Sequence, residues 1–151
     1  MRALLIGCLL FFFANNTFSQ ALTQTQQAAV TTEVMAVLDE FMLQFNDLNV
    51  PAWEATFQFP HYRLASGNMN VLEKPSGRTS TQLKNALGSE WHHSAWLQRE
   101  IVHLSATKVH VDTRFARYRE DNSLIAAFNS LYIVTFENER WGIKLRSSMA
   151  P

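Results

Sequence analysis

The fold is decided by the stretch "LIAAFNSLYIVTFENERWGIKLRSS", which runs from Leu124 to Ser148. Residues 124–137 form a long and almost wholly apolar segment, which predicts a strand that is covered on both faces. "NER" (Asn138–Arg140) supplies a turn, and "WGIKLRSS" (Trp141–Ser148) alternates as a half-buried strand does. The stretch therefore predicts two antiparallel strands at the end of the sheet.

The period of two continues upstream into the middle of the chain. Apolar residues occupy even positions at Val102 and Leu104 but odd positions from Val109 onward, so a turn must separate the two segments. We place that turn at "SATK" (Ser105–Lys108) and the next one at "EDNS" (Glu120–Ser123). The second half of the chain is therefore predicted to be a four-strand antiparallel meander.

The first half of the chain has helical periodicity instead. Apolar residues three and four apart form one stripe of a long first helix: Val30, Val34, Val37, Leu38, Phe41, Phe45 and Leu48. Pro51 suits the first turn of a short second helix. "HYRLA" and "MNVLE" (His61–Ala65 and Met69–Glu73) predict a hairpin, and "STQLKNAL" (Ser80–Leu87) predicts a third helix with Ser80 as its N-cap. Helices and strands that are segregated along the chain indicate an α+β domain.

This order of elements resembles the nuclear transport factor two-like superfamily, also called the SnoaL-like or ketosteroid-isomerase-like fold. The resemblance also rests on "FNDLNVPAW" (Phe45–Trp53) after the first helix and on the closing "YIVTFENERWGIKLRSS" (Tyr132–Ser148). "FPHYRLASG" (Phe59–Gly67) and "KVHVDTRFARY" (Lys108–Tyr118) look like an uncharacterised bacterial branch. The resemblance implies a cone-shaped, curved antiparallel sheet packed around the long N-terminal helix and two shorter helices.

The resemblance does not imply one activity. The superfamily holds isomerases, dehydratases, epoxide hydrolases, polyketide cyclases and members without known chemistry, so the fold does not fix the function. Its enzymes usually work with a carboxylate, or a histidine and a carboxylate, that points into the cone. No motif of this sequence aligns with those residues, and no catalytic role is carried over.

Residues 1–20 are predicted to be a secretory signal peptide. Arg2 precedes the twelve-residue apolar segment "ALLIGCLLFFFA" (Ala3–Ala14), and small and polar residues follow where a peptidase could cut. The segment is shorter than the roughly 20 apolar residues of a membrane-spanning helix. We therefore expect a single domain over residues 21–151 that is periplasmic or secreted, with no membrane association after cleavage.

Cleavage would leave a chain whose composition excludes several functions. It removes Cys8, the only cysteine, and with it disulfides, thiol nucleophiles and cysteine-ligated metals. It also removes Arg2 and leaves 12 basic against 13 acidic residues without a basic stripe, so no nucleic acid partner is expected. His110 and Asp112 share a strand face, but spacing supplies no further ligand, and neither a metal nor another cofactor is predicted.

Strand parity predicts which polar side chains face the core. Thr113 lies between apolar odd positions and should point inward, and Tyr62 and Leu64 should do the same on the first strand. Parity places most charged or titratable residues of the strands on the outer face: His61, Arg63, His103, His110, Asp112, Arg114, Lys144 and Arg146. A bulge would reverse the parity, and bulges often lie beside active sites.

"GSEWHHSAW" (Gly88–Trp96) is the segment with the most candidates for chemistry. Neighbouring side chains diverge in a helix or a strand, so His92 and His93 cannot both act at one point. One of them could serve as acid or base at the mouth of the cone, with the hydroxyl of Tyr62 beside it. Alternatively, the tryptophans seal the core edge and both histidines are solvated or cap the helix.

A small-ligand pocket is predicted to be lined by Trp53, Trp91, Trp96, Thr113 and either Asn129 or Ser130. Three functions stay open, and the sequence does not decide whether the protein is an enzyme. The first is an exported domain that binds a small, fairly apolar molecule. The second is an isomerase, dehydratase or cyclase that uses His92 or His93. The third is a non-catalytic assembly module, in which a homodimer covers the second apolar face of residues 124–137.

Overall fold

The computed structural model describes residues 21–65 and 67–150, and the predicted signal peptide (residues 1–20) lies outside the described residues. The helices and strands follow the predicted order. They are α1 (Gln24–Asn46), α2 (Val50–Ala55), β1 (Phe57–Ala65), β2 (Asn68–Leu72), α3 (Ser80–Leu87), β3 (His93–Leu104), β4 (Lys108–Tyr118), β5 (Leu124–Glu137) and β6 (Arg140–Ser148). The predicted α+β class is thereby confirmed.

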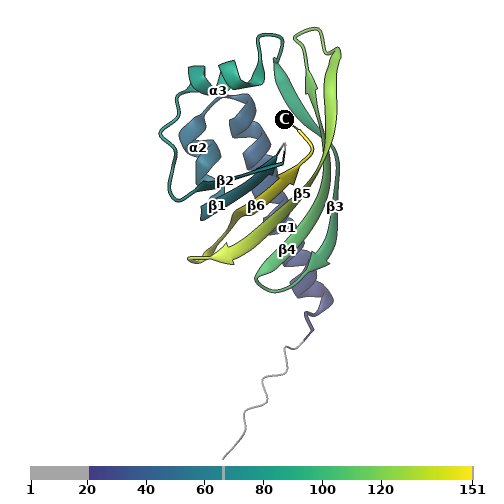
Figure 1. Ribbon diagram of the computed structural model, residues 1–151. Coiled ribbons are helices and arrows are strands. Elements are labelled where there is room, and N and C mark those ends of the chain that lie inside the picture. Colours follow the sequence, from purple (N-terminus) through teal and green to yellow (C-terminus); the bar gives the residue numbers. More distant parts are fainter. Residues whose placement is uncertain (1–20, 66, 151) are drawn as a thin grey trace, which may run out of the picture.

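The strands form one six-stranded sheet in the order β2-β1-β6-β5-β4-β3. Strands β3 to β6 are the predicted antiparallel meander, β1 joins β6 in parallel, and β2 pairs with β1 as a hairpin. Figure 1 shows the open sheet curving around α1, with α2 and α3 beside the upper half of that helix. The predicted sheet around a long N-terminal helix is confirmed.

Local hydrogen bonds begin the helices where the sequence supplies side-chain acceptors. Thr23 and Gln26 form a capping box at α1, in which each side chain accepts a backbone N–H of the other residue. The same box begins α3, but its N-cap is Thr79, so the prediction of Ser80 as the cap was wrong by one residue. Pro51 lies in the first turn of α2, as predicted.

The core lies between α1 and the concave face of the sheet. Val34, Leu38 and Phe41 of the predicted stripe are buried in one cluster with Val111 and Ile143 of the meander. The ring of Phe41 lies 5.7 to 6.2 Å from the ring centroids of Phe45, Trp53, Phe57, Trp96 and Tyr132. This aromatic cluster joins the helix to both ends of the sheet.

A β-bulge in β6 reverses the predicted orientation of Arg146. Ile143 pairs with Val134, but Leu145 pairs with Ile133, so Lys144 is an extra residue on its strand. Beyond the bulge, Arg146 pairs with the buried Tyr132 and shares its inward face. The prediction that Arg146 lies on the outer face was therefore wrong.

The predicted parity of β1 was also wrong. The pairing of β1 with β6 is irregular between Phe57 and Tyr62, so alternation does not continue through the strand. His61 is 0% exposed instead of facing out, Leu64 is 37% exposed instead of facing in, and Arg63 lines the inner side. Two arginines and a histidine that were expected in solvent thus reach the interior through two register irregularities.

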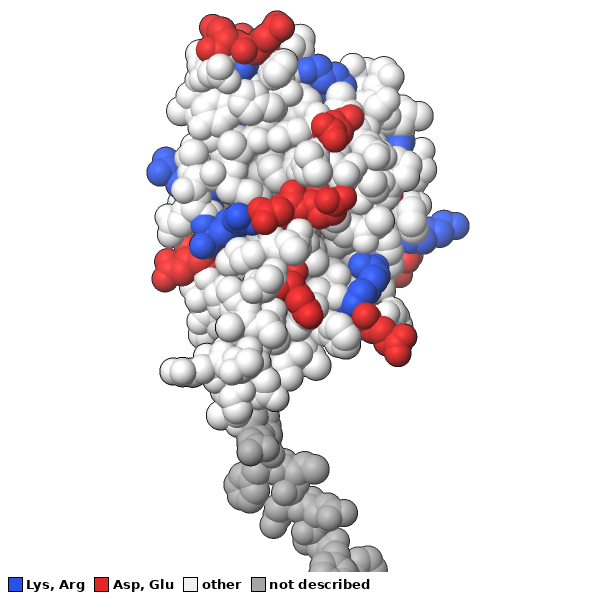
Figure 2. Space-filling model, turned by 180° about the vertical axis from the view of Figure 1, so that it is seen from behind, with Lys and Arg blue, Asp and Glu red and all other residues white. Residues whose placement is uncertain are grey.

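The remaining surface carries no extended area of one charge on the side seen from behind. Figure 2 shows acidic and basic side chains scattered among uncharged ones on that side. Within residues 21–65 and 67–150, no helix is long and apolar enough to cross a membrane. No group of three His, Cys, Asp or Glu side chains in the same residues is placed to hold a metal ion.

Candidate ligand-binding cavity

A cavity of about 400 Å³ lies between the three helices and the inner face of the sheet. Its apolar lining comes from helices and strands alike: Phe41, Met42, Phe45, Trp53, Val71, Leu72, Leu83, Ala86, Leu87, Phe115, Tyr132 and Ala150. The polar lining residues are Glu54, Arg63, Asn70, Ser76, Arg78, Ser94, Arg117, Arg146 and Ser148. The cavity therefore combines aromatic walls with a group of arginines.

Arg146 enters this cavity from β6 just beyond the bulge. Its guanidinium carbon lies 5.1 Å from the ring centroids of Phe41 and Phe57 and 5.4 Å from that of Trp53. These are cation–π distances, so the aromatic rings hold the charge in place. Burial lowers the pKa of Arg146, while the adjacent Tyr132 raises it. The group stays protonated because the ordinary pKa of arginine is far above neutral pH.

His61 holds the side chain of Arg146 in position. Its Nε2 accepts a hydrogen bond from Nε of Arg146 at 3.2 Å. Arginine can only donate, so the proton of the neutral ring lies on Nδ1, which donates to the Ile143 carbonyl at 2.8 Å. Burial, and next the charge of Arg146, lowers the pKa of His61 to about 3. Both ring nitrogens are occupied, so His61 positions Arg146.

Arg117 and Arg63 add further positive charge to the lining. After burial, the charge of Arg63 is the next cause that lowers the pKa of Arg117, and it also lowers that of Arg146. The Nε of Arg117 is buried and has no hydrogen-bond partner among the described residues. Neither Arg117 nor Arg146 takes part in a salt bridge within residues 21–65 and 67–150. Both cations thus lie in the cavity without a carboxylate partner.

Glu54 is the one carboxylate among the described lining residues, and it is already engaged. Its Oε1 accepts from the hydroxyl of Ser76 at 2.5 Å and its Oε2 from the Ser76 backbone N–H at 2.8 Å. Trp53, the residue before it on α2, is 6% exposed, and its Nε1–H has no acceptor in the part of the chain that the structure describes. The lining therefore holds more donors than acceptors.

The structure brings one predicted pocket residue, Trp53, to this cavity, and none of the predicted catalytic residues. His92 is exposed and lines a separate surface depression. His93 is half-buried, with its ring stacked on Tyr118 at 5.1 Å. Tyr62 is half-buried on β1 and does not line the cavity. Their catalytic roles remain predictions.

Trp91 and Trp96 lie in the core beside the cavity. The indole of Trp91 donates to the hydroxyl of Ser94 at 3.0 Å, and that of Trp96 donates to the Leu38 carbonyl at 3.2 Å. Each side chain is therefore satisfied within the protein. Their positions agree with the alternative in which the two tryptophans seal the core edge.

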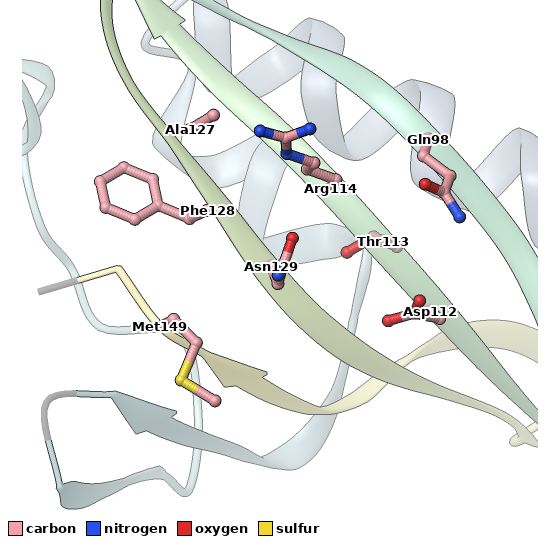
Figure 3. Close-up of a pocket in the computed structure, with 8 residues that line it drawn as sticks. All are labelled: Gln98, Asp112, Thr113, Arg114, Ala127, Phe128, Asn129 and Met149. Carbon is pink, nitrogen blue, oxygen red and sulfur yellow. The ribbon is translucent and has the colours of Figure 1, made fainter.

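Thr113 is buried, as its parity predicts, and of the alternatives Asn129 and Ser130 it is Ser130 that is buried; both hydroxyl groups bond within the sheet. The Thr113 hydroxyl donates to the Ser130 carbonyl at 3.0 Å. Asn129 is exposed and lies with Asp112 and Arg114 in a wide depression of about 700 Å³ on the outer face. Figure 3 shows these side chains projecting together from β4 and β5. The predicted pocket residues of these two strands are thus divided between both faces.

Two of the cavity arginines differ in how well the sequence signals them. Arg117 continues the odd positions that point inward along β4, so extending the parity past Phe115 would have found it. Arg146 carries no such signal, because its orientation depends on the extra residue opposite β5. Arg63 is hidden for the same reason on β1.

The fold is that of an α+β domain of the cystatin-like, NTF2-like kind. Residues 32–148 match the family described as "NTF2-like protein (DUF6841)", and the chain belongs to that family. No curated protein matches the sequence significantly.

Solved structures of low sequence identity share the fold. A protein of unknown function with a cystatin-like fold from Nostoc punctiforme PCC 73102 has a TM-score of 0.63 at 14% identity, covering 82% of this chain and 92% of the other. A ketosteroid isomerase-like protein from Erwinia carotovora atroseptica SCRI1043 has a TM-score of 0.54 at 18% identity, covering 85% and 100%. A hexachlorocyclohexane dehydrochlorinase from Novosphingobium barchaimii LL02 has a TM-score of 0.62 at 12% identity, covering 83% and 89%. Such likeness establishes the fold alone.

Proposed function

We propose that the protein binds a small molecule in the cavity between α1, α2, α3 and the concave face of the sheet. The observation that carries the proposal is a partly enclosed cavity lined by aromatic rings and a few convergent polar groups. The proposal includes export to the periplasm or beyond, as the apolar leader indicates, and a homodimeric state.

The volume and the lining both suit a ligand. Small-molecule sites usually span roughly 300–1,000 Å³ and are mostly apolar with a small number of orienting polar groups. The cavity of about 400 Å³ lies at the lower end of that range. A molecule of one or two rings would place its rings against Phe41, Phe45 and Phe115 and its polar end against the arginines.

Binding of N-phenyl-1-naphthylamine, a neutral probe that fluoresces in apolar surroundings, tests the proposal. We expect saturable binding to the purified protein. Ala86 is exposed on α3 and lines the cavity, so Ala86→Trp should block it and weaken binding by about tenfold or more. Asn85→Trp adds the same ring one residue away, outside the lining, and should leave binding unchanged. Equal binding by both variants, or none by the wild type, contradicts the proposal.

A second candidate function is proton transfer on the bound molecule. It is favoured by the buried carboxylate of Glu54, which lines the cavity and is held by two hydrogen bonds from Ser76. A positioned carboxylate can act as a general base, and arginines can stabilise the negative charge that develops on the substrate. Isomerisation and elimination are reactions of this kind, and two proteins of similar fold are described as ketosteroid isomerase-like and as a dehydrochlorinase.

Deuterium exchange distinguishes binding from proton transfer. A ligand that co-purifies with the protein would be incubated with it in heavy water and followed by NMR. An enzyme that abstracts a proton should place deuterium at a carbon atom of the ligand, and Glu54→Gln should abolish this exchange while binding is retained. Exchange that persists in Glu54→Gln excludes Glu54 as the base, and a complete lack of exchange leaves the protein as a binder.

A further inference from the structure

We infer that the ligand of this cavity is an organic acid, and that Arg146 and Arg117 bind its carboxylate while the aromatic walls hold its apolar body. The inference rests on the proposed function, because it names the chemical class of the molecule that occupies the same cavity.

The first argument is the imbalance of charge. Arg117 and Arg146 line the cavity and take part in no salt bridge within residues 21–65 and 67–150, and Glu54 is the one carboxylate of the described lining. Both oxygens of Glu54 already accept hydrogen bonds from Ser76. Removing cations from water without an adjacent anion is unfavourable, and an anion placed among them restores the balance. The cavity therefore favours a negative ligand over a neutral one.

The second argument is a pair of buried donors without an acceptor among residues 21–65 and 67–150. Nε1 of Trp53 and Nε of Arg117 are both buried and have no hydrogen-bond partner in those residues. Trp53 belongs to α2 and Arg117 to β4, yet both line the same cavity. Unpaired buried donors are rare in native proteins and call for an explanation. A carboxylate accepts up to about four hydrogen bonds, so it supplies the missing acceptors once the two side chains turn these N–H groups toward the cavity.

The third argument is the preorganisation of Arg146. His61 accepts from its Nε, and the faces of Phe41, Trp53 and Phe57 hold its guanidinium. A planar fork that is already fixed loses little side-chain entropy when it binds a carboxylate. His61 in turn is fixed by the Ile143 carbonyl, so the support for Arg146 extends into the sheet.

The apolar lining determines the chemical nature of the part of the ligand that lies away from its carboxylate. Phe45, Phe115 and Leu83 line the cavity away from β6, and they offer no hydrogen bond to a polar body. An aromatic or branched aliphatic acid satisfies both parts of the lining, whereas a sugar acid would place hydroxyl groups against these apolar side chains. A monocarboxylic acid with an apolar body is therefore the class that fits.

Calorimetry with 1-naphthaleneacetate and 1-naphthaleneacetamide tests the inference, because the two probes differ in the charged group and share the apolar body. We expect the acid to bind the wild-type protein at least about tenfold more tightly than the amide at neutral pH. Arg117→Met and Arg146→Met should each reduce this preference to about threefold or less. Arg114→Met removes an arginine of the same strand on the outer face and should preserve the preference.

The outcomes separate the inference from the proposed function. Equal affinity for acid and amide, in a protein that binds N-phenyl-1-naphthylamine, overturns the inference and leaves the proposed function intact. No binding of all three probes overturns both. A preference for the acid that Arg117→Met and Arg146→Met leave unchanged also overturns the assignment of these residues.

Each variant is first checked for a cooperative thermal transition, which shows that it is folded. Arg117→Lys keeps the charge without the planar fork and should give an intermediate preference for the acid.

Discussion

The two faces of the sheet hold their basic residues in opposite ways. On the outer face, Arg114 is exposed on β4 and Lys144 forms an ion pair with Glu137. On the inner face, and counting residues 21–65 and 67–150, the buried Nε of Arg117 has no partner and Arg146 lies against aromatic rings without a carboxylate. Arg114 and Arg117 are only three residues apart in sequence, and Lys144 and Arg146 are only two apart.

This difference separates charges that hardly affect folding from charges that oppose it. A cation on the outer face keeps its water or its ion pair, so it contributes little to the free energy of folding. Arg117 and Arg146 on the inner face have lost water and have no carboxylate partner within residues 21–65 and 67–150, which opposes folding. Proteins keep such arrangements where function needs them, because stability and activity favour different side chains at a binding site.

The largest effect should come from the aromatic cluster that builds the inner face. Phe41 is 4% exposed, and Phe41→Ala removes the ring that joins α1 to the sheet. We expect a loss of about 3–5 kcal/mol in the free energy of unfolding, measured by urea denaturation. Leu97→Ala on the outer face, where the side chain is 47% exposed, should change it by about 0.5 kcal/mol or less. Similar losses for both variants would remove the distinction between the faces.

The next effect concerns the buried His61, whose pKa falls from 6.5 to about 3 on folding because of burial and then the charge of Arg146. As the pH falls below 6.5, the unfolded chain takes up a proton at this residue and the folded one does not, so stability decreases. The slope for one proton is about 1.4 kcal/mol per pH unit, continuing until the pH approaches the folded pKa.

His61→Gln should therefore lose less stability than the wild type on acidification from pH 6.5 to 4.5, by about 2.3 kcal/mol in urea denaturation. His103→Gln, which alters an exposed histidine on the outer face, should retain the slope of the wild type. Parallel pH profiles for wild type and His61→Gln would show that His61 is protonated in the folded protein, and the account of its hydrogen bond with Arg146 would fail.

Much of the fold could be predicted because the sequence encodes it locally. The apolar stripe that ends at Leu48 fixes the face of α1, and the turns around residues 105–108 and 120–123 fix the meander. The bounds of α3 and β5 were predicted to the residue. On β4, regular alternation placed Thr113 inside and Asp112 outside, since β4 pairs with β5 without interruption from Lys108 to Arg117.

The cavity could not be predicted, because it depends on the register between strands and on where separate elements converge. The bulge at Lys144 exists only relative to β5, and it alone brings Arg146 inside. Residues 57–60 belong to β1, although they were expected to precede the strand, and the irregular pairing that follows buries His61. Histidine pairs attract attention in a sequence, yet His92 and His93 lie away from the cavity.

A comparison of Arg117 with Arg114 tests how much a buried charge on the inner face lowers the free energy of unfolding. Arg117→Met removes a buried cation whose Nε has no partner and replaces it with an apolar side chain beside Phe128. We expect the ligand-free protein to gain about 1 kcal/mol of stability in urea denaturation. Arg114→Met on the outer face should stay within about 0.5 kcal/mol of the wild type. A destabilised Arg117→Met would mean that this arginine holds the fold together.

The smallest effect should come from the ion pair of Lys144 and Glu137, which lies at the bulge but outside the cavity. The Nζ to Oε2 distance is 3.0 Å, and both side chains remain partly exposed. A double-mutant cycle with Lys144→Met and Glu137→Gln should give a coupling energy of about 0.2–1 kcal/mol that shrinks in 1 M salt. Affinity for 1-naphthaleneacetate should not change in either variant, since the extra residue, and not its charge, turns Arg146 inward. A large coupling together with loss of binding would mean that the ion pair maintains the bulge, and the outer face would then share in building the site.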